Sequence, residues 1–313
     1  MGKVCFGVDV GGTTVKIGIV TEVGQLIDMW EIPTRTEDGG AHILEDVAAS
    51  VNKAIEDNGY EREDIVGVGL GIPGPVTEDG VVLGCVNLGW SITPAATILS
   101  ELLGMPVKLG NDANVAALGE QWQGGGKGHE NMVMVTLGTG VGGGIIINGK
   151  ILAGTKGAAG EIGHMHVAAP EDTFKCGCGM YGCLETLTSA TGIVNLATRL
   201  VNETDKETAM RKLEKITAKD VLDLAKEGDA GAKEVVDKMV YYLSGAMATI
   251  GVVVNPEIFV IGGGVSKAGQ YLIDLIEAAF KEKCFHALKT TQFALATLGN
   301  SAGMVGAARL ILQ

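Results

Sequence analysis

Residues 7–20, GVDVGGTTVKIGIV, decide the fold of this chain. Two runs rich in β-branched residues, 4–10 and 15–20, flank the turn GGTT, and this pattern predicts a β-hairpin. A second stretch, MVTLGTGVGGGIII from Met134, aligns with the first so that Gly11 falls on Gly138. The match indicates either an internal duplication or two unrelated hairpins. Backbone N–H groups in glycine-rich turns of this kind can bind anions.

The segments after the first hairpin alternate between strand-like and helical patterns. A third strand is expected at 26–32, and Thr93 should cap a helix whose first residue is Pro94. The remaining expected elements are helices at 43–58 and 93–103 and strands at 65–71 and 107–109. This alternation predicts an α/β fold.

Composition restricts the class of protein. The 313 residues suffice for two domains, and 46% apolar with 19% charged residues describes a globular chain. A net charge of −13 argues against a nucleic-acid partner, which would need clustered lysine and arginine. The N-terminus shows no signal-peptide pattern, and the longest apolar run, 239–254, is short for a membrane span. We therefore expect a cytoplasmic protein with reduced thiols and no membrane contact.

Two glycine motifs resemble dinucleotide-binding fingerprints but lack the required context. GLGIPG at 69–74 and GTGVGG at 138–143 both fit G-x-G-x-x-G, yet neither pattern leads into a helix. GGGKG at 124–128 lacks the spacing and the hydroxyl residue of a Walker loop. Neither type of nucleotide site is expected.

Asp9 lies inside an otherwise apolar strand beside the first glycine turn. It is either a buried carboxylate held by backbone donors or a residue that orients Mg²⁺ or its waters. In the second interpretation Thr13, Thr14 and Lys16 lie near phosphate groups. The position beside a phosphate-binding turn favours the metal role.

Asn111 and Asp112 follow a strand and precede a helical run that begins near Ala113. Either residue type commonly caps a helix N-terminus. A carboxylate there is also favoured in its ionised form and can serve as a general base. The two roles are compatible, so both stay open at this point.

Three of the six cysteines, Cys176, Cys178 and Cys183, lie in the stretch CGCGMYGCLE. His164 and His166 precede them. Three thiolates and one imidazole would complete a tetrahedral zinc site, whereas a C-x-x-C redox motif is absent and a cytoplasmic disulfide is disfavoured. Zinc is the favoured interpretation, and spacing does not decide between the two histidines.

Together these motifs resemble the ROK family of sugar kinases, repressors and related proteins, most closely its bacterial glucokinases. The resemblance covers nearly the whole chain and is carried, in order, by DVGGTTVKIG, GIPGPV, NLGW, GNDANVAALGE, LGTGVGGGI, GAAGEIGHM, CGCGMYGCLE and IGGGVS. EIGH followed by C-G-C-G-x-x-G-C-x-E is highly specific. The glycine turns alone would be weak evidence.

The resemblance implies a role for each matching residue. His164, and not His166, would hold a structural Zn²⁺ with Cys176, Cys178 and Cys183, and Asp112 would be the catalytic base. The implied sugar ligands are Gly74, Asn87, Asn111, Asp112, Glu161, His164 and Glu185. The implied contacts to ATP and Mg²⁺ are Asp9, Gly11, Gly12, Thr13, Thr14, Lys16, Gly138, Thr139 and Gly140, with Gly262, Gly263 and Gly264 beside the adenosine.

The resemblance also implies an architecture and a reaction. We expect the actin-like, hexokinase-type (ribonuclease H-like) ATPase fold, with two α/β domains around a cleft and a zinc-binding loop. Residues 1–115 with the C-terminal helix at about 300–313 would form the small domain, and 116–299 the large domain with the dimerisation surface of a homodimer.

The expected reaction is ATP-dependent phosphorylation of glucose at its 6-hydroxyl. Fructose, mannose, allose and N-acetylmannosamine are alternative substrates, because one sequence does not show hydroxyl geometry. A sugar-responsive ROK regulator is a further alternative. It would need an N-terminal winged helix-turn-helix, whereas here the first hairpin begins within ten residues of Met1.

Overall fold

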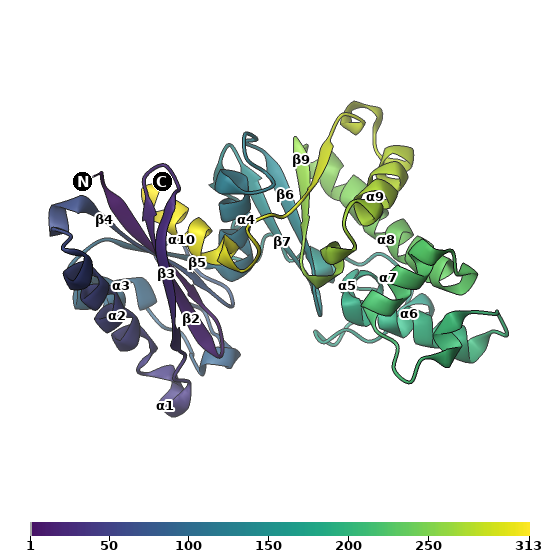
Figure 1. Cartoon of the computed structure of the whole chain (residues 1–313), viewed down its shortest axis with the longest axis horizontal. Helices are drawn as coiled ribbons and strands as arrows, with labels where there is room; N and C mark the ends of the chain where they lie inside the picture. The colour runs from purple at the N-terminus through teal and green to yellow at the C-terminus, as the bar shows by residue number, and fades with distance from the viewer. Residues whose placement is uncertain (1) are drawn as a thin grey trace. The chain divides into compact units, whose positions relative to one another are not determined.

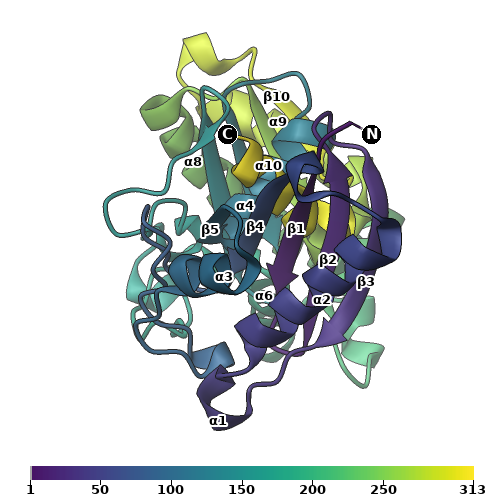
Figure 2. The ribbon, with the colours of Figure 1, turned by 90° about the vertical axis from the view of Figure 1, so that its left-hand side faces the viewer.

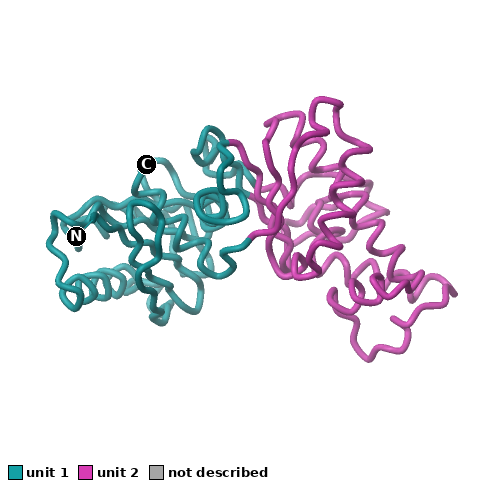
Figure 3. The backbone as a smooth tube through the Cα atoms, turned by 45° about the horizontal axis from the view of Figure 1, so that its top comes forward, with its two compact units in different colours: residues 1–130, 144–160, 297–313 teal, residues 131–143, 161–296 magenta. Residues whose placement is uncertain are grey.

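The computed structural model describes residues 2–313. Its contacts divide the chain into two compact units, which Figure 3 colours separately: unit 1 is 1–130, 144–160 and 297–313, and unit 2 is 131–143 and 161–296. The chain therefore passes between units four times, at 130/131, 143/144, 160/161 and 296/297. The domain ranges expected from the sequence stay a prediction.

Unit 1, most of whose elements are labelled in Figure 1, is built on a mixed five-stranded sheet. Its strand order, β3-β2-β1-β4-β5, runs from right to left in Figure 2. β1 pairs antiparallel with β2, as the predicted hairpin requires. On its other side β1 pairs parallel with β4. The strands are β1 (Val4–Val10), β2 (Thr14–Thr21), β3 (Leu26–Pro33), β4 (Ile65–Ile72) and β5 (Val107–Asn111). The helices are α1 (Glu37–Gly40), α2 (Ile43–Asn58), α3 (Ala95–Leu103), α4 (Asp112–Gln123) and α10 (Ala302–Leu312).

Helices cover both faces of this sheet, and in Figure 2 α2 and α3 lie in front of it with α10 behind. Alternate residues of β1 point to opposite faces. Phe6 and Val8 join the large core with α2 and α3, whereas Cys5 packs with Ala308 of α10. Asp9 has the same parity as Cys5, so its side chain lies on the face that α10 covers.

Glycines let α10 approach its neighbours backbone to backbone. A Cβ atom on Gly7 of β1 or Gly69 of β4 would overlap a carbonyl oxygen of α10. Between the helices, a Cβ on Gly119 of α4 would overlap the oxygen of Ala302, and one on Gly306 would overlap the oxygen of Val115. These positions leave no room for any side chain.

Unit 2 holds most of a second five-stranded sheet with the order β10-β9-β6-β7-β8. The strands of this sheet are β6 (Met132–Leu137), β7 (Val141–Ile147), β8 (Lys150–Ile151), β9 (Ile258–Gly262) and β10 (Gln292–Leu295). The end of β7 and all of β8 lie in residues 144–151, which belong to unit 1. The helices of unit 2 are α5 (Glu185–Thr188), α6 (Ala190–Glu203), α7 (Ala218–Glu227), α8 (Ala230–Val254) and α9 (Gln270–Lys283).

The two sheets share one strand order when the second is written from the other end. β6 pairs parallel with β9, and β9 with β10, as β1 pairs with β4, and β4 with β5. β7 and β8 are antiparallel, as are β2 and β3. This common topology supports the duplication that the matching hairpins suggested.

The structure changes one local prediction and supports others. Thr93 does not cap α3, because its backbone pairs with Val82 and Pro94 occupies the cap position. GLGIPG ends β4 in a turn and GTGVGG runs into β7, so neither opens a helix.

Across residues 2–313 no helix combines the length and apolar content needed to cross a bilayer.

Gly306→Ala should destabilise unit 1, because its methyl group would overlap the Val115 carbonyl and separate α10 from α4. We expect the free energy of unfolding to fall by about 1–3 kcal/mol, measured by urea unfolding followed by circular dichroism. Gly245→Ala in α8 is the matched control, since no atom lies within 4 Å of its Cβ position. It should gain about 0.5–1 kcal/mol. Equal stabilities for the two variants would contradict the packing account.

Candidate functional site

The first glycine turn connects β1 to β2 and is held by backbone contacts. The N–H of Gly11 donates to the Thr14 oxygen at 3.0 Å, and the Thr34 hydroxyl donates to the Gly11 oxygen at 2.6 Å. Gly12 and Thr13 at the tip are exposed. The turn therefore presents its tip to solvent on a fixed base.

Asp9 and Lys16 face each other across this hairpin. Asp9 also lies against the start of α10, since a Cβ on Gly303 would be 2.7 Å from its carboxylate carbon. Burial raises the pKa of Asp9, Lys16 lowers it, and the nearby Asp112 raises it again. Two neighbouring carboxylates of which one is partly buried form a site that a cation would stabilise.

Asn111 and Asp112 share the junction of β5 and α4. Asn111 is the N-cap: its Oδ1 accepts from the N–H groups of Ala113 and Asn114 at 3.1 and 3.2 Å. Its Nδ2 donates to the oxygen of Gly74 at 3.1 Å, which ties the loop after β4 to the helix start. Asp112 is the first helical residue, and its Oδ1 accepts from the N–H of Ala113 at 2.8 Å. The cap interpretation therefore belongs to Asn111, and the role of Asp112 as a base stays a prediction.

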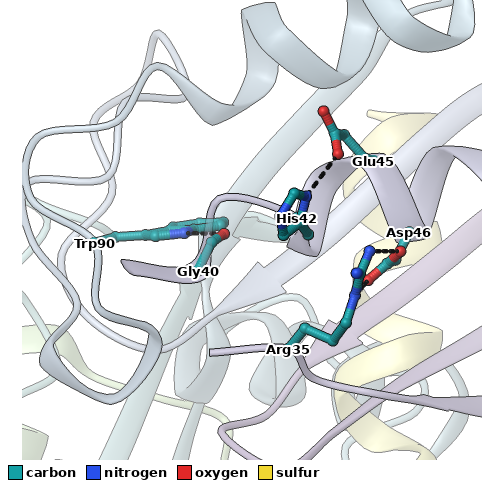
Figure 4. A network of polar contacts seen from close by, with 6 residues as sticks. All are labelled: Arg35, Gly40, His42, Glu45, Asp46 and Trp90. Atoms are coloured by element: carbon teal, nitrogen blue, oxygen red, sulfur yellow. Dashed lines mark hydrogen bonds and ion pairs between the residues drawn. The ribbon is translucent and has the colours of Figure 1, made fainter. Parts of the chain in front are cut away.

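Asn87 is exposed on a short 3₁₀ turn (Val86–Leu88) next to the first glycine turn. A Cβ on Gly12 would lie 3.8 Å from the Asn87 Cβ. The turn is anchored by buried Trp90, whose Nε1 donates to the oxygen of Gly40 at 3.0 Å (Figure 4).

Two exposed polar contacts lie on either side of Gly40 in the sequence. Figure 4 shows Arg35 Nε 2.7 Å from Asp46 Oδ2, and His42 Nδ1 2.9 Å from Glu45 Oε2. Exposed pairs of this kind contribute little stability on their own. The buried Trp90 contact is the stronger restraint on the Asn87 turn.

The second glycine turn, Gly138–Gly140, lies at the N-terminus of α6 in unit 2. Ala190 N–H donates to the Gly138 oxygen at 2.8 Å, and the Thr191 hydroxyl donates to the Thr139 oxygen at 2.8 Å. A hollow of about 260 Å³ beside the turn is lined by residues that include Thr139, Glu185 and Ser189. A glycine turn beside a helix N-terminus is suited to binding phosphate groups.

His164, Cys176, Cys178 and Cys183 place their ligand atoms within 4.8 Å of one another. Cys178 Sγ lies 3.7 Å from Cys183 Sγ, and Cys176 Sγ lies 3.6 Å from His164 Nδ1. These separations match the edges of a tetrahedron of about 3.8 Å that Zn–S bonds of about 2.3 Å would give. The chemistry and spacing of this donor set fit zinc.

His166 lies beside the cluster without joining it. Its backbone pairs with Cys183, and its ring packs against Gly182. Among the described residues, the group that could hold a metal contains His164 and not His166.

Glu185 and Glu161 flank the cysteine–histidine cluster. Glu161 is exposed directly before the 3₁₀ turn Ile162–His164. Glu185 begins α5, and its Oε1 accepts from the Cys176 thiol at 2.8 Å. Its other oxygen lies near the second glycine turn, because a Cβ on Gly140 would be 2.6 Å from Oε2. Burial, together with the hydrogen bond to Glu185, raises the pKa of Cys176.

Gly262–Gly264 end β9 and open a 3₁₀ turn, Gly264–Ala268. A hollow of about 360 Å³ lies between this turn and the start of α7. It is lined by Ala190, Thr217, Ala218, Lys219, Leu222, Asp223, Gly264, Val265, Lys267 and Ala268. No sequence motif predicted that α7 lines this hollow. T-A-K-D at 217–220 is readable as a capping box, but the box does not reveal what the helix packs against.

The predicted site residues thus form one group in each unit. Unit 1 brings together Asp9, Gly11–Thr14, Lys16, Gly74, Asn87, Asn111 and Asp112. Unit 2 holds the zinc ligands beside Glu161 and Glu185, the turn Gly138–Gly140 near Glu185, and Gly262–Gly264. Each group combines a glycine turn with carboxylates.

Comparison with known proteins identifies the family. The model of the ROK family matches residues 5–313. The chain belongs to the ROK family. This ROK protein is 46% identical to a curated glucokinase of Halalkalibacterium halodurans over 98% of the chain and 94% of that relative.

Solved structures agree with this assignment. A ROK hexokinase from Thermus thermophilus matches with a TM-score of 0.80 and 31% identity, over 97% of this chain and 96% of that one. A ROK glucokinase from Streptomyces griseus, solved with glucose and AMPPNP, matches with a TM-score of 0.71 and 33% identity over 98% of both chains. The family and the fold class expected from the sequence are confirmed.

Trp90→Phe should loosen the turn that carries Asn87, because it removes the indole N–H that Gly40 accepts. We expect a loss of about 1–2 kcal/mol in the free energy of unfolding, measured by urea unfolding, and faster hydrogen exchange of the backbone amides at 86–88. Trp30→Phe is the control, because it loses a comparable bond to Ser50 elsewhere in unit 1. Equally accelerated exchange at 86–88 in both variants would contradict a specific role of Trp90.

Proposed function

We propose that this ROK protein is a glucokinase, which transfers the γ-phosphoryl group of ATP to the 6-hydroxyl of glucose. The observation that carries the proposal is the 46% identity to a glucokinase over 98% of the chain. The proposed base, phosphate turns and zinc ligands all lie inside the matched residues. Carbohydrate metabolism in the cytoplasm is the setting that this activity implies.

Asp112 is proposed as the general base. It is the first residue of α4, directly after the N-cap Asn111. It would accept the proton of the 6-hydroxyl as that oxygen attacks the γ-phosphorus. Gly74, Asn87 and Asn111 from unit 1, and Glu161, His164 and Glu185 from unit 2, would bind the sugar hydroxyls.

The two glycine turns are proposed to bind the phosphates of ATP. The residues that would contact the phosphates are Gly11, Gly12, Thr13, Thr14 and Lys16 in unit 1 and Gly138, Thr139 and Gly140 in unit 2. Backbone N–H groups there would stabilise charge that develops on the transferring group. The hollow beside Gly262–Gly264 would take the adenosine. Asp9 would hold Mg²⁺ or its waters, and the bound cation would neutralise phosphate charge.

Zinc is proposed as a structural ion held by His164, Cys176, Cys178 and Cys183. With four protein ligands such a site has no open position for Lewis-acid chemistry. The ion would hold the segment from which Glu161, His164 and Glu185 reach the sugar.

We also propose that the protein is a homodimer. Dimers are usual in the family, and Tyr241, Val252 and Val253 are exposed on α8 of unit 2, by 61%, 65% and 78%. Contiguous exposed apolar patches mark protein interfaces, and these three side chains are candidates for such a patch on α8. Light scattering that gave the mass of a single chain would contradict the dimer.

A coupled ADP-release assay over a panel of hexoses and N-acetylhexosamines tests the activity. Glucose should give the highest kcat/KM, whereas a higher value with fructose, mannose, allose or N-acetylmannosamine would reassign the substrate. Asp112→Asn should lose at least about 100-fold in kcat, since general-base catalysis is typically worth that much, while glucose binding measured by calorimetry persists. Turnover close to wild type in this variant would exclude Asp112 as the base.

Metal analysis of the purified protein should find about one zinc per chain, as four ligands imply. Cys178→Ser should lower zinc content and raise the KM for glucose, because one ligand is lost and the loop loosens. Cys284→Ser is the control, since this thiol lies outside the cluster. Fully active wild-type protein free of zinc would refute the structural role.

A further inference from the structure

Glu120, near the end of α4, is completely buried and has no part in the proposed reaction. Its Oε2 accepts from the N–H of Gly125 at 2.8 Å and of Thr297 at 3.0 Å. Its Oε1 accepts from the N–H of Leu298 at 2.8 Å. Because a buried carboxylate without donors is expensive, these three contacts account for its presence in the core.

The three donors belong to two segments through which the chain passes between the units. Residues 124–130 lead from α4 to the crossing at 130/131, and Thr297 and Leu298 follow the crossing at 296/297. Glu120 and all three donors lie in unit 1. A Cβ on Gly124 would overlap Glu120 Oε2, so this glycine leaves the space that the carboxylate occupies. One side chain thus fixes two of the four crossing segments to one helix.

The same helix carries Asp112 at its other end. Glu120 follows Asp112 by eight residues, or about 12 Å along the helix axis. A third crossing also touches α4, since a Cβ on Gly144 would lie 3.0 Å from the oxygen of Ala113. The helix that positions the proposed base is therefore also the anchor for three of the crossings.

We propose that Glu120 is a positioning residue that limits the arrangements open to the two units and thereby strengthens the binding of both substrates. This inference rests on the proposed function, in which glucose and ATP each have ligands in both units. Binding either substrate then also fixes the joint between the units, by which we mean the four crossing segments. The fewer arrangements the joint has beforehand, the smaller is the free-energy loss on binding.

A quantitative consequence distinguishes this role from a merely structural one. Without Glu120, each substrate alone binds more weakly by one common factor, because each must fix the same loosened joint. The second substrate meets a joint that is already fixed, and binds as in the wild type. The coupling between glucose and nucleotide therefore rises by that same factor.

Glu120→Gln tests the inference, because it keeps the side-chain shape and places an amide NH₂ group where N–H donors converge. Calorimetry measures glucose and MgAMPPNP, each alone and in the presence of the other. We expect both single-ligand affinities to fall about fivefold, and the coupling to rise about fivefold. Should this variant not fold, Glu120→Asp keeps the charge on a shorter side chain and should show the same pattern to a smaller degree.

Asp229→Asn is the matched control. Asp229 caps α8 and accepts from Ala209 N at 2.7 Å, Ala232 N at 2.8 Å and the Thr208 hydroxyl at 2.7 Å. It therefore joins two segments as Glu120 does, but both stay inside unit 2. Its loss should lower stability and leave all four binding constants unchanged.

Three results would overturn the role of Glu120: unchanged affinities in Glu120→Gln, unequal factors for the two substrates, or the same pattern in Asp229→Asn. A wild-type protein that binds both substrates without coupling would also overturn it, while leaving the proposed function intact. A wild-type protein that binds neither glucose nor MgAMPPNP would instead refute the proposed function.

Discussion

Helix α10 packs with its backbone against β1, β4 and α4, and the proposed site in unit 1 depends on this contact. Glycines at 7, 69, 119 and 306 remove the side chains that would otherwise separate these elements. The start of α10 consequently reaches the Asp9 carboxylate, while α4 presents Asp112 beside it. The distance between a proposed cation ligand and the proposed base is therefore set by how closely main chains can approach.

Local sequence patterns predicted the two hairpins, whereas the actin-like fold was predicted from the family resemblance. The hairpins around Gly11 and Gly138 follow from alternating β-branched residues and glycine turns, and the structure adds that both sheets share one strand order. Thr93 was misjudged as a cap because a local rule does not show that its backbone pairs with Val82. The pairing of Thr93 with Val82 therefore determines the backbone conformation of Thr93.

The same limit applies to the site. The cysteine spacing indicated a metal cluster but left His164 and His166 equivalent. The family resemblance selected His164, and in the folded loop that ring lies near Cys176 whereas the ring of His166 packs against Gly182. Glu120 is the last residue of the motif GNDANVAALGE. Two of its donors, the N–H groups of Thr297 and Leu298, nevertheless lie about 180 residues away along the chain. The role of a buried carboxylate depends on its hydrogen-bond donors, and no local sequence pattern predicts them.

The placement of α10 also constrains the order in which the molecule can be completed during synthesis. Unit 2 consists of 131–143 and 161–296, so all of its residues have been made before α10 exists. The sheet of unit 1 is made first, but the helix that covers one of its faces is contributed by 302–312. Domains generally fold as units while the ribosome is still translating. Unit 1 begins the chain, but it is completed last, because α10 is the final helix to be made. Until then the sheet face that carries Cys5, Gly7 and Gly69 lacks the helix that packs against it in the complete chain.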